Sequence, residues 1–143
     1  MTLLVMDTGV LVAGLYWRNE AHQCLRAWEQ GAFHLAVSDP VFEEYQRVAW
    51  RVKEQERLAG DPEPVLRLIQ DRALWVVPEP LGRRVCRDPK DDKFIEAALA
   101  ARAPVLLARD ADLTELEKPF GVEIVTPRQF LGRLPRRVRR PLH

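Results

Sequence analysis

The stretch LLVMDTGVLV, residues 3–12, decides the fold. Its first four residues are apolar, as in a short buried strand; Asp7 closes this run, and a second apolar segment with a helical pattern follows. A buried strand that leads directly into a helix is typical of α/β proteins built on a parallel sheet. In such sheets ligands gather beyond the carboxyl ends of the strands, so Asp7 is the first candidate site residue.

Short apolar runs alternate with helical patterns along the rest of the chain. This alternation predicts an α/β fold, a single domain with a central, mostly parallel β-sheet of about five strands flanked by helices. We expect strands at residues 3–7, 33–37, 74–77, 104–108 and 122–125, and helices at residues 9–18, 20–30, 40–59, 62–73, 89–102, 111–117 and 127–133. Pairs of an acid or Thr with Pro predict helix starts at Asp39, Asp61, Asp88 and Thr126. Gly31 and Gly60 are expected to end helices, and residues 78–86 to form a long loop.

Length and composition indicate one ordinary globular domain. The chain has 143 residues, of which 47% are hydrophobic and 30% charged, which excludes disordered and collagen-like classes. The formal net charge is +1, but residues 133–143 contain five arginines and no acid. We therefore expect a domain over residues 1–134 and a basic, flexible tail over residues 135–143.

The cysteine pattern and the apolar runs favour a reduced, cytoplasmic protein. Cys24 and Cys86 are far apart and have no CxxC or Cys/His spacing, and the N-terminus lacks the charged-then-apolar order of a signal peptide. The longest apolar runs are far shorter than the roughly 18 residues that cross a bilayer. We expect no membrane association.

Further acids follow the predicted strands. Asp110 and Asp112 come directly after the run at residues 105–108, and Asp88, Asp91 and Asp92 open the helix after the long loop. If the strands are neighbours, these acids meet Asp7 in one cleft. Each acid alone also has a structural explanation as a turn former or helix cap. Their combined order along the chain favours a shared site.

Helical geometry selects among adjacent acids. At about 100° per residue, Glu44 lies at the border of the apolar stripe of its helix, whereas Glu43 points away from that stripe. The same projection places Asp91 on the inward face of the later helix and Asp92 about 90° around it. We therefore take Asp91 as the buried acid, Asp92 as the second choice and Asp88 as the helix cap.

Several carboxylates in one cleft repel one another unless a cation compensates their charge. Hard oxygen ligands without His or Cys select Mg²⁺ or Mn²⁺ over zinc. A hydrated cation held in this way activates water and neutralises charge on a phosphoryl group, so phosphodiester hydrolysis is the expected chemistry.

At these residues the chain resembles the PIN-domain family, metal-dependent ribonucleases that supply many toxins of toxin–antitoxin pairs. The resemblance covers nearly all of residues 3–132. It is carried by VMDTGVLV (5–12), VS followed by VFEEY (37–38 and 41–45), CRDPKDDKFIEAA (86–98), LLARDADL (106–113), and VTP with FL (125–127 and 130–131). The segment at residues 86–98 is the most distinctive, and it is similar to a subgroup of toxin components.

The resemblance implies that the family's acids fall on Asp7, Glu44, Asp91 and Asp110, with Asp92 and Asp112 as supporting metal-binding acids. It also implies Mg²⁺ or Mn²⁺, an RNA substrate, a small antitoxin that blocks the cleft, and a homodimer. Arg83, Arg84, Arg87 and the arginines of the tail are candidate contacts for RNA phosphates, and solvated or locally paired charge is the alternative.

Two positions depart from the family pattern. Gly9 stands where the family usually has Asn, and Ala108 where it usually has Thr or Ser. Both replacements remove side-chain hydrogen bonds that would orient a carboxylate or a metal-bound water. They define an alternative function, a catalytically weak or inactive PIN-fold module that acts by binding RNA or an antitoxin.

Overall fold

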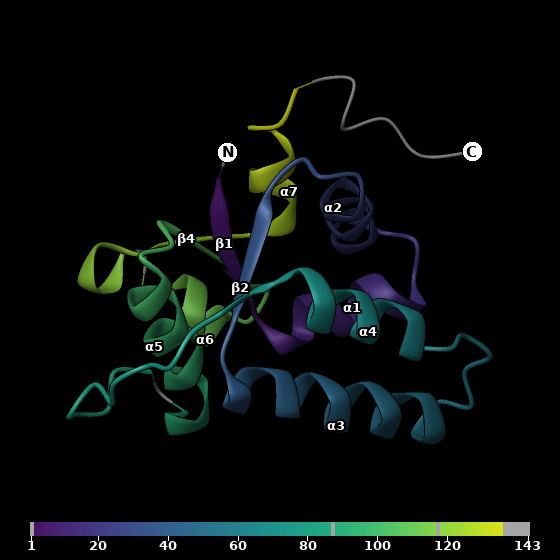
Figure 1. Ribbon diagram of the computed structural model, residues 1–143, viewed down its shortest axis with the longest axis horizontal. Helices are drawn as coiled ribbons and strands as arrows, with labels where there is room; N and C mark the ends of the chain where they lie inside the picture. The colour runs from purple at the N-terminus through teal and green to yellow at the C-terminus, as the bar shows by residue number, and fades with distance from the viewer. Residues whose placement is uncertain (1, 87, 117, 136–143) are drawn as a thin grey trace.

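The sheet has five strands, all parallel, as predicted. A computed structural model of the chain describes residues 2–86, 88–116 and 118–135. The strands are β1 (Leu3–Met6), β2 (His34–Val37), β3 (Leu74–Trp75), β4 (Val105–Leu107) and β5 (Glu123–Val125), in the spatial order β3-β2-β1-β4-β5 (Figure 1). The fold is therefore an α/β domain with β1 at the centre of the sheet.

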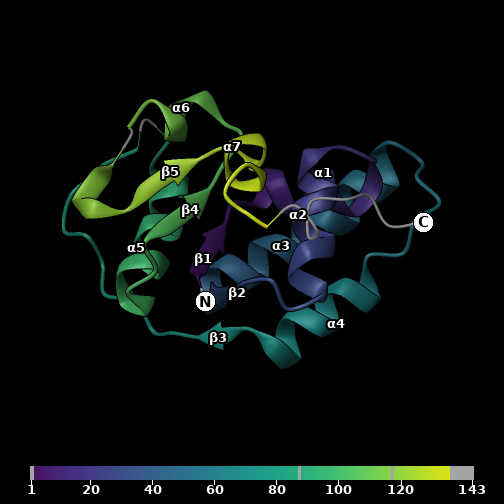
Figure 2. The ribbon, with the colours of Figure 1, turned by 90° about the horizontal axis from the view of Figure 1, so that it is seen from above.

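Helices cover both sides of this sheet. They are α1 (Thr8–Tyr16), α2 (Glu20–Glu29), α3 (Asp39–Gln55), α4 (Glu63–Arg72), α5 (Asp92–Ala101), α6 (Ala111–Thr114) and α7 (Pro127–Leu131), with short 3₁₀ turns η1 (Pro89–Asp91) and η2 (Pro119–Gly121). In Figures 1 and 2, α5 and α6 lie on one side of the central strands, and α1, α2 and α4 lie on the other. None of the helices in the described ranges is both long and apolar enough to cross a bilayer.

Several predicted boundaries were wrong. The strand expected at 74–77 stops at Trp75, where the chain leaves the sheet edge ahead of Pro78. The helix expected to reach residue 59 ends at Gln55, because Arg57 takes a left-handed conformation (φ 52°). The Lys53 ammonium then donates to the carbonyls of Leu58 and Gly60. Gly60 therefore does not end the helix.

The predicted helix starts need a similar adjustment. Ser38, not Asp39, caps α3, because its hydroxyl accepts from the Val41 N–H at 3.3 Å. Asp88 caps η1, and Thr126 caps α7 through the expected capping box.

The strand order changes direction at β1, which pairs with β2 on one side and with β4 on the other. Met6 lies level with Leu107, and the Asp7 N–H donates to the Leu107 carbonyl at 2.8 Å. A parallel sheet opens a crevice at such a switch point, outside the carboxyl ends of its strands. The fold thus places Asp7 and the segment after β4 on the two sides of that crevice.

The long loop at residues 78–86 is held by two acids of α5. Asp92 accepts from the N–H groups of Cys86 at 2.7 Å and Val85 at 3.1 Å, and Glu96 accepts from the Leu81 N–H at 3.0 Å. These backbone groups have no strand partner, so the two carboxylates replace the hydrogen bonds that a sheet would supply. Cys86 and Cys24 are both buried free thiols.

Replacing Asp92 by Ala should lower the free energy of unfolding by about 2–3 kcal/mol, because two loop N–H groups lose their acceptor. The matched control is Asp39→Ala, which removes an exposed acid from the first turn of α3. It should change stability by less than about 0.5 kcal/mol. Urea unfolding measures both values, and equal losses would show that the Asp92 contacts do not stabilise the loop.

Candidate functional site

Asp7 lies at the carboxyl end of β1 and is buried. It follows β1 directly and caps α1, with its side chain accepting from the Val10 N–H at 2.7 Å. The pKa of this carboxyl is raised to about 7, mainly by burial. The charges of Asp91 and Asp110 also raise the pKa, whereas hydrogen bonds from the backbone of Val10 and Arg109 lower it. Asp7 is therefore a buried acid that a nearby cation would help to ionise.

Asp91 and Asp110 reach the same crevice from the other side. Asp91 is the last residue of η1, and Asp110 caps α6 just after β4. Burial raises the pKa of Asp91 to about 6, and the charges of Asp88, Asp110, Glu44 and Asp112 add to the effect. Acids that are far apart in the chain thus lie within electrostatic reach of one another.

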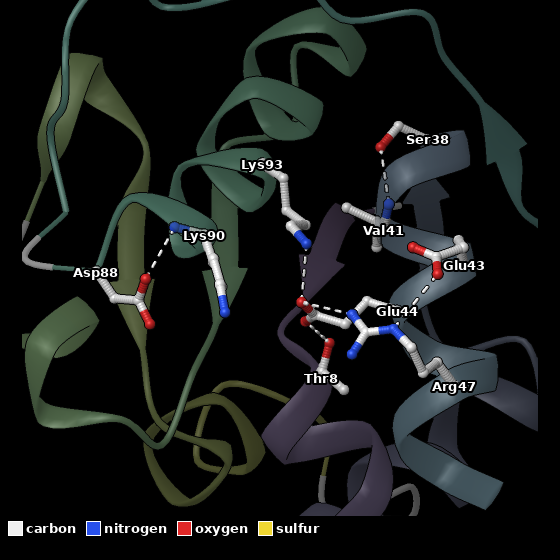
Figure 3. Close-up of polar contacts among 9 residues, drawn as sticks. All are labelled: Thr8, Ser38, Val41, Glu43, Glu44, Arg47, Asp88, Lys90 and Lys93. Atoms are coloured by element: carbon white, nitrogen blue, oxygen red, sulfur yellow. Dashed lines mark hydrogen bonds and ion pairs between the residues drawn. The ribbon is translucent and has the colours of Figure 1, made fainter. Parts of the chain in front are cut away.

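Glu44 on α3 is far less exposed than the adjacent Glu43, in keeping with the helical projection. Its side chain is 14% exposed, whereas that of Glu43 is 66% exposed. Thr8 on α1 donates a short hydrogen bond to Oε2 of Glu44, and the Lys93 ammonium on α5 donates to Oε1 at 2.8 Å (Figure 3). The buried Tyr45 hydroxyl donates to the Met6 carbonyl and so holds this part of α3 against the end of β1.

The predicted burial order of the adjacent acids was wrong. Asp92 is the buried member of the pair, and Asp91 is only half-buried. The projection assumed one α-helix from residue 89, but residues 89–91 form a 3₁₀ turn, which advances by about 120° per residue and so changes the phase. Burial raises the pKa of Asp92, but hydrogen bonds from Cys86 and the Val85 backbone outweigh it and leave the pKa lowered.

The acids line the crevice without forming a tight cluster. Within residues 2–86, 88–116 and 118–135, no three His, Cys, Asp or Glu side chains come together closely enough to hold a metal ion. Asp7, Asp91 and Asp110 are coupled through their charges, and Glu44 and Asp112 are coupled to Asp91. A hard divalent cation would relieve mutual repulsion of this kind, but the described acids are too far apart to form a ligand set as they stand.

A basic pocket adjoins this crevice. Its volume is about 300 Å³, and it is lined by residues from the start of α2 (Asn19, Glu20, Ala21), the segment after β4 (Arg109) and the start of α7 (Thr126, Pro127, Arg128). Arg109 directly precedes Asp110, and its backbone also donates to Asp7. Arg109 and Arg128 are the basic residues of this lining, and Glu20 is its acidic residue.

Sequence reasoning did not select Thr8, Lys93, Arg109 or Arg128. Arg109 could have been found, because it is adjacent to a candidate acid. Lys93 gave no signal of its own, since its partner Glu44 lies on another helix. Of the arginines that were selected, Arg83 stacks over Phe120 at 5.7 Å. Arg87 and the arginines beyond residue 135 lie outside the described residues.

These features define an α/β protein with carboxylates gathered at the switch point of a parallel sheet. The PIN domain profile matches residues 3–112, so the chain belongs to the PIN domain family. Members of this family are generally nucleases that use divalent metal ions. The PIN domain assignment that the motifs suggested is thereby confirmed.

A solved structure supports the same fold. The chain resembles one in the crystal structure of VapBC2 from Rickettsia felis bound to a DNA fragment from its promoter, with a TM-score of 0.56 and 13% sequence identity. The likeness covers 87% of this chain and 98% of that chain. No curated protein sequence matches the chain.

Replacing Asp7 by Asn should stabilise the metal-free protein at neutral and higher pH. The raised pKa means that the folded state holds this proton more tightly than the unfolded state, so ionisation destabilises the fold as pH rises from about 4 to about 7. Asn keeps the helix cap without the charge. We expect a gain of about 4 kcal/mol at pH 8 that disappears near pH 4.

The measurement is urea unfolding in EDTA across this pH range. The exposed Asp71→Asn variant is the control and should show no pH-dependent gain. A gain for Asp7→Asn that is equal at pH 4 and pH 8 would contradict a buried, repelled carboxylate.

Proposed function

We propose that the chain is a metal-dependent endoribonuclease, which hydrolyses RNA phosphodiester bonds and is the cytoplasmic toxin of a toxin–antitoxin pair. The observation that carries this proposal is the placement of the acids: Asp7 follows β1 and Asp110 follows the neighbouring β4, and Asp91 ends the turn before α5. Asp7 and Asp110 also cap helices, but capping alone does not require three acids at neighbouring strand ends, whereas oxygen ligands of this kind suit a divalent cation.

The roles of the residues follow from their surroundings. Asp7, Asp91 and Asp110 would hold Mg²⁺ or Mn²⁺, with Asp112 as a supporting acid. The bound ion would supply an activated water and neutralise charge at the phosphorus. Asp92 contributes indirectly, because it fixes the loop and the start of α5 next to Asp91.

The basic pocket suits the backbone of an RNA substrate. An acidic crevice by itself repels RNA, so binding needs cations close to the site of cleavage. Arg109 and Arg128 line one pocket, Arg109 directly precedes Asp110 in the chain, and neither arginine forms an ion pair within the described residues. We propose that they contact phosphates of the bound strand.

The proposed partners are an antitoxin and a second copy of the chain. The fold likeness to a chain of VapBC2 supports an antitoxin partner. Trp17, Trp50 and Trp75 are each more than a third exposed, and large apolar side chains of this kind are suited to packing between subunits. They are the observation that favours a homodimer.

Asp91→Asn should lower the rate of RNA cleavage at least about 100-fold, because a metal contribution of several kcal/mol is weakened. The assay uses structured and unstructured RNA with Mn²⁺, Mg²⁺ or EDTA, and EDTA should abolish cleavage by the unmodified chain. Asp71→Asn should cleave normally. Equal residual cleavage by the unmodified, Asp7→Ala and Asp91→Asn proteins would indicate a contaminating nuclease and contradict the proposal.

The second candidate is a PIN-fold binding module, which Gly9 and Ala108 favour. A Cβ at Gly9 would meet Oδ1 of Asp7 at 3.6 Å, an ordinary contact, so a side chain fits there. If the site is catalytic but weakened, Gly9→Asn should raise cleavage about tenfold by restoring a polar group next to Asp7. Gly9→Ala, which fills the same space without an amide, should not. A lack of cleavage in all three proteins would favour the binding module.

Replacing both Arg109 and Arg128 by Ala should weaken RNA binding and lower its salt dependence. Loss of two phosphate contacts to a single strand should reduce the slope of log K against log salt by about 1.4. Binding is measured in EDTA by fluorescence anisotropy. The control replaces Arg26 and Arg133, which pair with glutamates, and should leave the slope unchanged. An unchanged slope in the first variant would contradict the assignment.

A further inference from the structure

The basic pocket lies where α2, the segment after β4 and the start of α7 meet. The Cys24 thiol on α2 donates to the Pro127 carbonyl at 3.6 Å, and the Ala108 N–H donates to the Val125 carbonyl at 2.9 Å. Helices α2 and α7 lie side by side in both views (Figures 1 and 2). The lining is therefore tied to helices and sheet, which place functional groups more precisely than free loops do.

Two polar side chains of the lining have their acceptor oxygens engaged as helix caps. Asn19 Oδ1 accepts from the His22 N–H at 2.9 Å, and Thr126 Oγ1 accepts from the Gln129 N–H at 3.2 Å. The amide hydrogens of Asn19 and the hydroxyl hydrogen of Thr126 have no partner in the part of the chain that the structure describes. These two side chains therefore offer donors to a ligand.

The charged side chains of the lining are unpaired. Among the described residues, Glu20, Arg109 and Arg128 form no ion pair and their side chains make no hydrogen bond. A carboxylate that served only to neutralise the two arginines would pair with one of them. Its place in the first turn of α2 suits the helix dipole, but any acid in a first turn would do so. Glu20 is thus the carboxylate acceptor that this lining offers to a ligand.

This pattern of donors and acceptors matches guanine among the RNA bases. Guanine has two adjacent donors, N1–H and the N2 amino group, which fit the two oxygens of a carboxylate, and its O6 and N7 accept from donors such as Asn19 and Thr126. Adenine and cytosine place a ring-nitrogen acceptor next to their amino group, and uracil places a carbonyl on each side of N3–H. Each of these three bases would therefore set a lone pair against Glu20.

The size of the pocket suits a single nucleotide. A volume of about 300 Å³ is at the small end of ligand-binding pockets. The buried residues Ala21 and Pro127 supply apolar surface for a base. Sequence-specific recognition of RNA acts mainly on unstacked bases of single strands. The Arg109 backbone donates to Asp7, so one residue connects the pocket to the buried acid.

We propose that the basic pocket is a base-recognition subsite, which holds one unstacked guanine of the RNA while the Glu20 carboxylate accepts from N1–H and the N2 amino group. This inference rests on the proposed function, because it takes RNA as the substrate. It makes Glu20 a specificity-determining residue and leaves the phosphate contacts to Arg109 and Arg128. A negative charge in the pocket weakens its general attraction for RNA, so Glu20 acts by selecting a base and not by adding affinity for every strand.

The test measures binding of short single-stranded RNAs by fluorescence anisotropy in EDTA, so that neither metal nor cleavage contributes. The probes are oligouridine and the same strand with one central guanosine, adenosine, cytidine or inosine. The guanosine strand should bind about tenfold more tightly than the oligouridine, adenosine and cytidine strands, because only guanine forms the bidentate contact. Inosine lacks the N2 amino group and should lose most of this preference.

Glu20→Gln removes the carboxylate and should reduce the preference for guanosine to less than about twofold, without weakening the binding of oligouridine. The matched control is Glu63→Gln. Glu63 is the exposed first residue of α4, as Glu20 is of α2, so the control makes the same change of charge outside the pocket. It should keep the full preference for guanosine.

Three results would overturn the inference and leave the proposed function standing: equal binding of all strands by the unmodified protein, an inosine strand bound as tightly as the guanosine strand, or an undiminished preference in folded Glu20→Gln. Binding of none of the strands would contradict RNA as the substrate and so overturn the proposed function itself. The comparison of strands uses the unmodified protein, so the inference can fail even if Glu20→Gln does not fold. Circular dichroism establishes which variants are folded.

Discussion

The fold and the site both depend on the position of Asp7 at the end of the central strand. Its N–H completes the pairing of β1 with β4, and its carboxylate accepts from the first turn of α1. The same residue therefore ends a strand, starts a helix and carries a buried negative charge. That charge opposes folding, because burial and neighbouring acids raise its pKa to about 7. Burying the Asp7 carboxylate at the switch point of the sheet lowers stability. We therefore infer that this residue has a role besides capping α1.

The adjacent acids Asp91 and Asp92 make different contacts. Asp92 holds the backbone of the long loop with both of its oxygens, whereas Asp91 accepts no hydrogen bond within the described residues. The 3₁₀ turn before α5 separates the two, since it changes the direction in which each side chain projects. The hydrogen bonds of Asp92 lower its pKa, and the charges near Asp91 help to raise its own. The residue that fixes the loop, Asp92, and the residue that we propose as a metal ligand, Asp91, are thus neighbours with opposite environments.

The fold could be predicted from the sequence because its signals are local. Short apolar runs and Pro-marked helix starts define the five strands and seven helices, and the border position of Glu44 follows from the period of α3. The remaining errors have local causes that composition does not reveal, such as the left-handed Arg57 that ends α3. The contact between Lys93 and Glu44 could not be predicted, because the two residues are 49 positions apart in the sequence. The contact depends on how α5 packs beside α3.

The arrangement of charge favours a polyanionic substrate over a small one. Carboxylates that gather a cation also repel phosphates, so a chain that only bound metal would need no arginines beside them. Arg109 links the two requirements, since its backbone supports Asp7 while its side chain lines the basic pocket next to Asp110. A strand lying across this boundary would place one phosphate near the acids and a neighbouring one near the guanidinium groups. If the chain is the ribonuclease proposed above, the adjacency of Arg109 and Asp110 would help to fix which phosphodiester bond of the strand lies at the carboxylates.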